Sequence, residues 1–319
     1  MLYRRHLRIK ALQALYSWYS GGFESLPVGE KQLLKSIDKL YELFVYQLSF
    51  LVEVRRFTLV RIEENKNKYF PTEEDLNPNL KFVNNRVLTL LDDNRDFLKK
   101  EEVLKVNWSQ EQEMFLKFYH LLRNSDFYAK YLSETEDSLE EDKKFVIKVI
   151  DRLMLDFEIL RSYYDEKDMY FTEGYDLTNI LLVNFVDSIT TKFTVDSSLP
   201  GIYKTSGQKV NDDEYFARTL FRKVILNDDE YSKIVEGKTK NWDYDRIPLI
   251  DVILLKMAIV ELLEMNTIPV KVTMNEYIEL AKYFSTAKSK IFINGVLDKL
   301  ISEFKTDERI KKTGRGLID

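Results

Sequence analysis

Residues 248–305, PLIDVILLKMAIVELLEMNTIPVKVTMNEYIELAKYFSTAKSKIFINGVLDKLISEFK, carry the clearest helix boundaries in the chain. They divide into three largely apolar runs, at about 248–266, 269–284 and 287–305. The first two runs begin at prolines, which suit the first turn of a helix because the missing N–H would have no partner there. The stretch therefore predicts three consecutive helices.

The rest of the chain also favours helices over strands. Six prolines and ten glycines in 319 residues are few for a turn-rich β architecture, and alternation of Val, Ile and Thr at period two is scarce. A first helix is predicted at 3–19, stopped by Gly21 and Gly22. We therefore predict an all-α protein, with further helices at about 30–68, 79–92, 109–131, 140–165, 175–192 and 212–236, and a linker at 193–210.

The composition excludes several classes of site. The chain has no cysteine, so disulfides, thiolate metal sites and a cysteine nucleophile are absent. Its two histidines, His6 and His120, are too few for a histidine-rich metal site. The composition does not exclude magnesium bound by carboxylates, but we expect no metal site and no cofactor. The N-terminus turns basic before any long apolar run and no stretch approaches a membrane span, so we expect a cytoplasmic protein.

Charge is distributed unevenly along the sequence. The net charge of −5 argues against a protein that coats nucleic acid over its whole surface. However, residues 1–20 hold Arg4, Arg5, Arg8 and Lys10 without any acid, whereas residues 134–142 hold six acids and no base.

The basic first helix is one candidate for RNA binding. Arg4 and Arg8 are four residues apart and share a helix face, and Arg5 and His6 lie beside them. Arginine suits phosphate because its planar fork makes two parallel hydrogen bonds. Gln13, Tyr16 and Trp18 lie on the same helix and could form hydrogen bonds with unpaired bases or stack on them. For Tyr16 and Trp18, packing within the protein is an alternative role. The competing interpretation of the arginines is a solvated helix end.

The second candidate lies near the C-terminus, where Lys288 and Lys290 arrive as a helix begins. Free backbone N–H groups and the helix dipole favour an anion at such a position. Gly295 inside the same helix costs about 1 kcal/mol relative to alanine. We interpret this glycine as permitting close contact with another helix.

No catalytic motif is visible in the sequence. It contains no phosphate-binding glycine loop, no dinucleotide fingerprint and no nucleophile elbow, and neither histidine sits in a recognisable triad. Adjacent carboxylates such as Glu63 and Glu64 point to different faces of a helix, so they indicate solvated surface rather than an acid/base pair. We therefore do not expect an enzyme.

Both ends of the chain resemble the NusB family. Residues 4–18, RRHLRIKALQALYSW, look like the family's arginine-rich first helix followed by its A-x-Q-A-L-Y signature. Residues 268–282, IPVKVTMNEYIELAK, and 292–299, FINGVLDK, are similar to the family's I-P-x-K-V-x-I-N-E-x-x-E-L-A-K and F-V-N-G-V-L-D-K runs. The resemblance covers about residues 1–23 and 210–303.

This resemblance implies a pair of helical bundles set at an angle that binds boxA RNA together with NusE, a ribosomal small-subunit protein. The assembly would act on the RNA polymerase elongation complex and suppress termination in ribosomal RNA operons, without any chemistry. Matching positions imply RNA contacts from Arg4, Arg5, His6, Arg8, Gln13, Lys288, Lys290, Phe292 and Asn294. Tyr16 and Asp251 fall where the family meets NusE. The sequence departs from the pattern at Ile291, where the family usually has lysine.

The resemblance also divides the chain. We expect a NusB-like first helix at 1–23, a helical central insertion at 24–209, a NusB-like bundle at 210–305 and a flexible tail at 306–319. The insertion resembles that of enlarged family members and is either an extension of the scaffold or an interaction module, for instance for polymerase or ribosome-assembly factors. A relative of the NusB-like domain of ribosomal RNA methyltransferases is the alternative function, and self-association of the free protein stays open.

Overall fold

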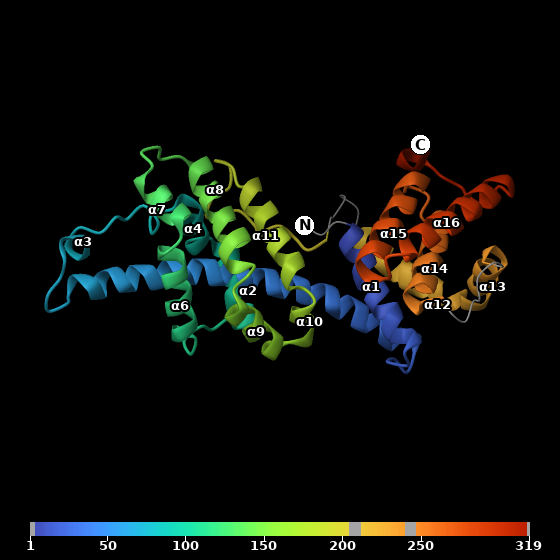
Figure 1. Ribbon diagram of the computed structural model, residues 1–319, viewed down its shortest axis with the longest axis horizontal. Helices are drawn as coiled ribbons and strands as arrows, with labels where there is room; N and C mark the ends of the chain where they lie inside the picture. Colours follow the sequence, from blue (N-terminus) through green and yellow to red (C-terminus); the bar gives the residue numbers. More distant parts are fainter. Residues whose placement is uncertain (1–3, 204–211, 240–246, 318–319) are drawn as a thin grey trace. The chain divides into compact units, whose positions relative to one another are not determined.

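The computed structural model describes residues 4–203, 212–239 and 247–317 (Figure 1). Within these ranges the regular elements are all helices and no strand occurs, so the all-α prediction is confirmed. None of the described helices is long and apolar enough to cross a membrane. The chain forms two compact units, which we call unit 1 (Asp38–Ile202) and unit 2 (Leu2–Ile37 and Tyr203–Asp319).

Unit 2 is built around one buried helix, α14 (Leu249–Glu264). All its residues from Asp251 to Leu262 are buried, and a helix that is buried on every side must be surrounded by other helices. Five helices provide this cover (Figure 1): α1 (Arg4–Tyr19), α12 (Asp212–Leu226), α13 (Asp228–Lys238), α15 (Val270–Phe284) and α16 (Ser289–Thr306). The three helices predicted in 248–305 are therefore present, and each begins within two residues of its predicted start.

The C-terminal segment packs against the end of α14. Lys312 Nζ donates hydrogen bonds to the carbonyl oxygens of Glu261 (3.2 Å) and Met265 (3.0 Å), and Thr313 N–H donates to the carbonyl of Asn266 (2.9 Å). A lysine satisfies carbonyls that the last turn of a helix leaves without partners. Where a flexible tail was expected, residues 307–317 instead cap α14.

Helix α2 (Leu26–Lys66) begins in unit 2 and continues in unit 1. It starts four residues earlier than Glu30, where the sequence pattern placed its start. Gly29 permits a close approach in this first turn, because a Cβ there would lie 2.7 Å from Cζ of Phe221. The beginning of α2 therefore packs against α12 at a position where only glycine fits without rearrangement.

Unit 1 contains the rest of α2 and a core rich in aromatic rings, among them Phe50, Trp108, Phe115 and Phe118. Its shorter helices are α3 (Glu73–Leu76), α4 (Arg86–Asp92), α5 (Arg95–Leu104), α6 (Gln112–Arg123), α7 (Asp126–Ser133), α8 (Leu139–Val149), α9 (Glu158–Lys167), α10 (Met169–Thr172) and α11 (Tyr175–Ser188). The sequence pattern did not predict α3, α5 or α10.

Three predicted helices are broken in the structure. Ser125 Oγ donates to the carbonyl of Leu122 between α6 and α7, and Asn227 Nδ2 donates to the carbonyl of Lys223 between α12 and α13. Such side chains end helices because they compete for backbone groups. The third, expected at 140–165, passes through a π-helical turn at Ile150–Met154 before α9 begins. The predicted linker at 193–210 is described only as far as 203.

The acidic stretch at 134–142 is engaged within unit 1. Arg86 forms ion pairs with Asp137 (2.6 Å) and Asp142 (3.0 Å), and Lys81 Nζ donates to the carbonyls of Glu134 (2.8 Å) and Glu136 (3.0 Å). Much of the negative charge is thus locally neutralised. This stretch therefore holds segments of unit 1 together.

Candidate functional site

The first candidate region, on α1, is organised by a buried ion pair. Arg8 is 2% exposed, and its Nε and Nη2 atoms lie 2.8 and 2.7 Å from the two carboxylate oxygens of the fully buried Glu261 on α14. Thr273 and Tyr277 on α15 donate their hydroxyls to the same carboxylate, at 2.8 and 3.2 Å. Arg8 therefore joins α1 to α14 and α15.

The electrostatics of this pair favour the charged state. Burial lowers the pKa of the Arg8 guanidinium, but the charge and hydrogen bonds of Glu261 outweigh burial and hold the pKa above its usual value. Burial and the neighbouring Glu261 raise the pKa of Tyr277. Glu261 accepts charged donors at both of its oxygens, which is the arrangement a buried carboxylate needs.

Arg5, one turn earlier, is ion-paired at the surface. Its Nε and Nη2 atoms lie 2.9 and 2.7 Å from the carboxylate of Glu276 on α15, and its side chain is 48% exposed. Arg4 lies half-buried with its guanidinium 5.2 Å from the ring centroid of Phe216. Residues 1–20 contain no acid in the sequence, but in the folded protein α14 and α15 place carboxylates beside the arginines of this segment.

His6 and Gln13 lie against the protein interior. His6 is 8% exposed, and burial, assisted by the charge of Arg5, lowers the pKa of its imidazole to about 4. It is therefore neutral at physiological pH. Gln13 is half-buried, and its Oε1 atom is buried without a hydrogen bond. Neither side chain forms part of an exposed cationic surface.

The two residues matched to the NusE contact differ in exposure. Tyr16 is 46% exposed on α1, whereas Asp251 is 2% exposed in the first turn of α14. The Oδ1 atom of Asp251 is buried without a hydrogen bond. Only Tyr16 can be touched directly by another molecule.

The second candidate region forms a groove beside α16. The groove has a volume of about 430 Å³ and is lined by Lys238, Lys288, Ile291, Phe292, Gly295, Val296 and Lys299. The lining thus combines apolar side chains with three lysines. Ile291, which stands where the family usually has lysine, is 75% exposed, and Phe292 is 8% exposed. Asn294 is half-buried and donates a 3.3 Å hydrogen bond to Asp298.

Gly295 does not have the role that the sequence indicated. A Cβ added at this position would meet no atom within 4 Å, so the glycine does not permit close helix contact. It instead lines the groove, which a side chain there would narrow. Sequence reasoning also missed Lys299, although positions 288, 292, 295 and 299 follow helical spacing and share one face.

The two regions lie near each other across α15. A hydrogen bond from Lys282 lowers the pKa of Glu279, and the charges of Arg5 and Lys290 add to this effect. Glu279 is thus within electrostatic reach of a cation from each region. Segments almost the whole chain apart in sequence therefore contribute to one side of unit 2.

Arg8 and Arg5 should differ sharply in their contribution to stability. We expect Arg8→Ala to lower the free energy of unfolding by about 3–5 kcal/mol, since it leaves Glu261 buried without its partner. Arg5→Ala, the matched control on the same helix, should cost less than about 1 kcal/mol because its pair is solvent-exposed. Urea denaturation measures both, and equal losses would contradict the assignment of Arg8 as a structural residue.

The buried His6 should make stability dependent on pH. Its folded-state pKa of about 4 lies below the ordinary value of 6.5. Its contribution is therefore fully present above pH 6.5 and is lost as the pH falls toward 4, because the unfolded chain takes up the proton more readily. Urea denaturation at pH 7 and pH 5 should show a smaller loss in His6→Gln than in the parent protein. The same loss in both proteins would show that His6 is not the group responsible.

Comparison with known proteins finds similarity over part of this chain. Residues 181–302 match the model of the NusB family. The chain is 44% identical over 103 residues to the transcription antitermination protein NusB of Salinibacter ruber, which covers 32% of this chain and 64% of that protein. It is 38% identical to the protein of the same name from Chloroherpeton thalassium, over 33% of this chain and 49% of that one.

A third relative of that name, from Geobacter sulfurreducens, is 44% identical over 27% of this chain and 63% of its own length. The chain thus spans less than two thirds of each of these three relatives. No solved structure matches the chain. The family match begins inside α11, before the boundary at 210 that the sequence predicted. The resemblance is confirmed for the C-terminal part of the chain: residues 181–302, but not residues 1–23, match the NusB family model, within a chain larger than NusB.

Proposed function

We propose that this chain is a transcription antitermination factor that binds boxA-type single-stranded RNA together with NusE and supports transcription of ribosomal RNA. The observation that carries the proposal is the groove beside α16, whose lining combines apolar side chains with lysines. Proteins that hold single strands combine cations for the phosphates with apolar or aromatic surfaces for the bases. The three relatives are named transcription antitermination proteins, which supports the proposed role in antitermination. The proposed function involves no chemical reaction.

Three cations in or beside the groove are available to phosphate, whereas Lys238 is paired with Glu303. Within the described residues, Lys288, Lys290 and Lys299 form no ion pair, whereas Arg5 and Arg8 are both engaged by carboxylates. The exposed Ile291 and the ring of Phe292 provide the adjoining apolar contact. We therefore assign most of the phosphate contacts to α16 rather than to α1.

The α1 region has a secondary part in this proposal. Arg4 and Arg5 are accessible and can add contacts to a strand that crosses α15 toward α1. Arg8 and His6 are buried, so they shape the surface without touching RNA. Tyr16 provides the contact for NusE, whereas Asp251, which is buried in the first turn of α14, does not touch NusE directly.

Substitutions in the groove should weaken RNA binding without unfolding the protein. We expect Lys288→Glu/Lys290→Glu to lower the affinity for boxA RNA by roughly tenfold or more, and to reduce the salt dependence, because two phosphate contacts are lost. Gly295→Leu should also weaken binding by filling the groove. Fluorescence anisotropy with labelled boxA RNA at several salt concentrations measures these effects.

Two variants serve as controls. Lys305→Glu changes the same charge at the far end of α16 and should leave the affinity unchanged. Gly295→Ala should raise the free energy of unfolding by about 1 kcal/mol through helix propensity, which shows that the position has no packing need for glycine. RNA binding that survives both groove substitutions would refute the assignment of this site.

A further inference from the structure

Unit 1 carries an arm that extends beyond its other helices. The arm consists of residues 61–76, which comprise the last turns of α2, a turn and α3 (Figure 1). Tyr69 and Phe70 lie in that turn and are 90% and 81% exposed, the highest exposures among the large apolar side chains of the described residues. Their ring centroids are 4.6 Å apart in an edge-to-face arrangement. Most other aromatic side chains of unit 1 are buried.

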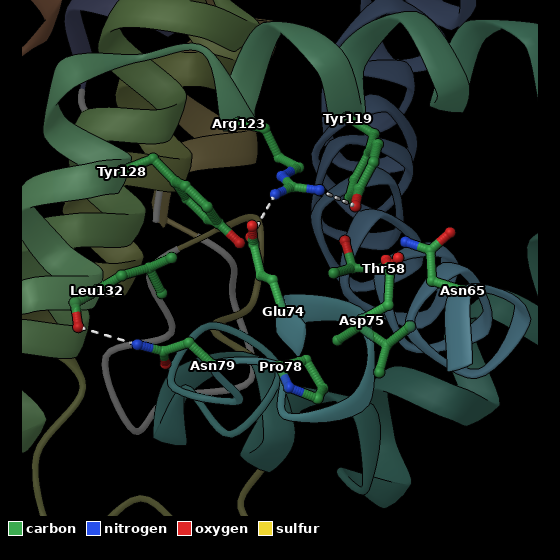
Figure 2. A pocket seen from close by; sticks show the side chains of 11 residues that line it. Thr58, Asn65, Glu74, Asp75, Pro78, Asn79, Tyr119, Arg123, Tyr128 and Leu132 are labelled. Atoms are coloured by element: carbon green, nitrogen blue, oxygen red, sulfur yellow. Dashed lines mark hydrogen bonds and ion pairs between the residues drawn. The ribbon is translucent and has the colours of Figure 1, made fainter. Parts of the chain in front are cut away.

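The arm is held in place at its base rather than hanging free. Arg123 on α6 donates to Glu74 (2.9 Å) and to the hydroxyl of Tyr119 (3.3 Å), and Asn79 donates to the carbonyl of Leu132 (3.1 Å), as Figure 2 shows. These bonds surround a small polar pocket of about 100 Å³.

The turn itself is also fixed. A capping box between Thr72 and Asp75 begins α3, and Pro71 restricts the backbone immediately after Phe70. An anchored aromatic pair loses little conformational freedom when it binds.

Large apolar side chains in this situation are typical of protein interfaces. Aromatic residues dominate the binding free energy of interfaces when they enter a pocket on the partner. Tyr69 and Phe70 contribute nothing visible to the core of unit 1, since they are almost fully exposed. Their exposure therefore has no explanation in the folding of this unit.

The charges of the arm favour a protein over RNA. Residues 61–76 hold five carboxylates and three cations. Each cation is already ion-paired within the arm, in the pairs Arg61–Glu64 (2.7 Å), Lys66–Glu63 (2.9 Å) and Lys68–Asp75 (3.3 Å). An RNA strand would meet an excess of negative charge beside the two rings, whereas a basic protein surface would be attracted to it.

We propose that the arm docks into an apolar pocket edged by lysine or arginine side chains on the transcribing RNA polymerase. The pocket would take Tyr69 and Phe70, and its basic edge would face the surplus carboxylates of the arm. The choice of polymerase rests on the proposed function, because an antitermination factor must act on the enzyme that makes the transcript. RNA binding by unit 2 is independent of this contact.

The test measures binding of the purified full chain to purified core RNA polymerase of the same organism, without RNA. We expect direct binding that weakens as salt rises. Tyr69→Ala/Phe70→Ala should weaken it on the order of 30-fold, as for loss of an interface hot spot. Glu73→Lys replaces a carboxylate that would face the basic edge of the pocket with a cation, so this variant should also bind the polymerase more weakly than the parent chain.

Met169→Ala, which removes another highly exposed side chain of unit 1, is the matched control and should leave binding unchanged. Affinity for boxA RNA is measured separately on every variant and should not change. Absence of direct binding by the parent chain, or equal binding by the double variant, would overturn the proposal, as would a loss of RNA affinity in the double variant. Failure of RNA binding by the parent chain would instead reject the proposed function alone.

Discussion

The ion pair between Arg8 and Glu261 is the constraint on which unit 2 depends. It places a charged group near the C-terminal end of α14, a helix whose residues from Asp251 to Leu262 are all buried. A buried carboxylate is tolerated only when donors satisfy both oxygens, and α1 and α15 must therefore approach α14 at this point. The pair thus fixes which helices meet around α14.

In the proposed function, the same pair limits which cations of unit 2 remain for phosphate. Because Glu261 and Glu276 engage Arg5 and Arg8, much of the positive charge that is conspicuous in the sequence is compensated in space. At the groove beside α16, Lys238 is paired with Glu303, whereas Lys288 and Lys299 form no ion pair within the described residues. We therefore place most of the proposed RNA contacts on α16 rather than on α1, and α15 lies between these two helices.

The sequence predicted the helices of unit 2 well because their boundaries depend on local chemistry. Pro248 and Pro269 mark the starts of α14 and α15, and the apolar spacing is regular. The site was predicted less well, because the burial of Arg8 depends on a residue 253 positions away. A signal was present nonetheless: Glu261 is an acid at the end of a nearly continuous apolar run, which indicates a buried partner. Gly295 was misjudged because helical spacing does not reveal whether a neighbour is present.

The central claim is that RNA lies along the groove beside α16 while Arg8 stays buried. Photo-crosslinking of boxA RNA that contains 4-thiouridine, followed by mass spectrometry of the adducts, tests it on the unaltered protein. The account predicts adducts on residues that line the groove, chiefly Ile291, Phe292 and Lys299. Adducts confined to α1, with none on α16, would contradict it.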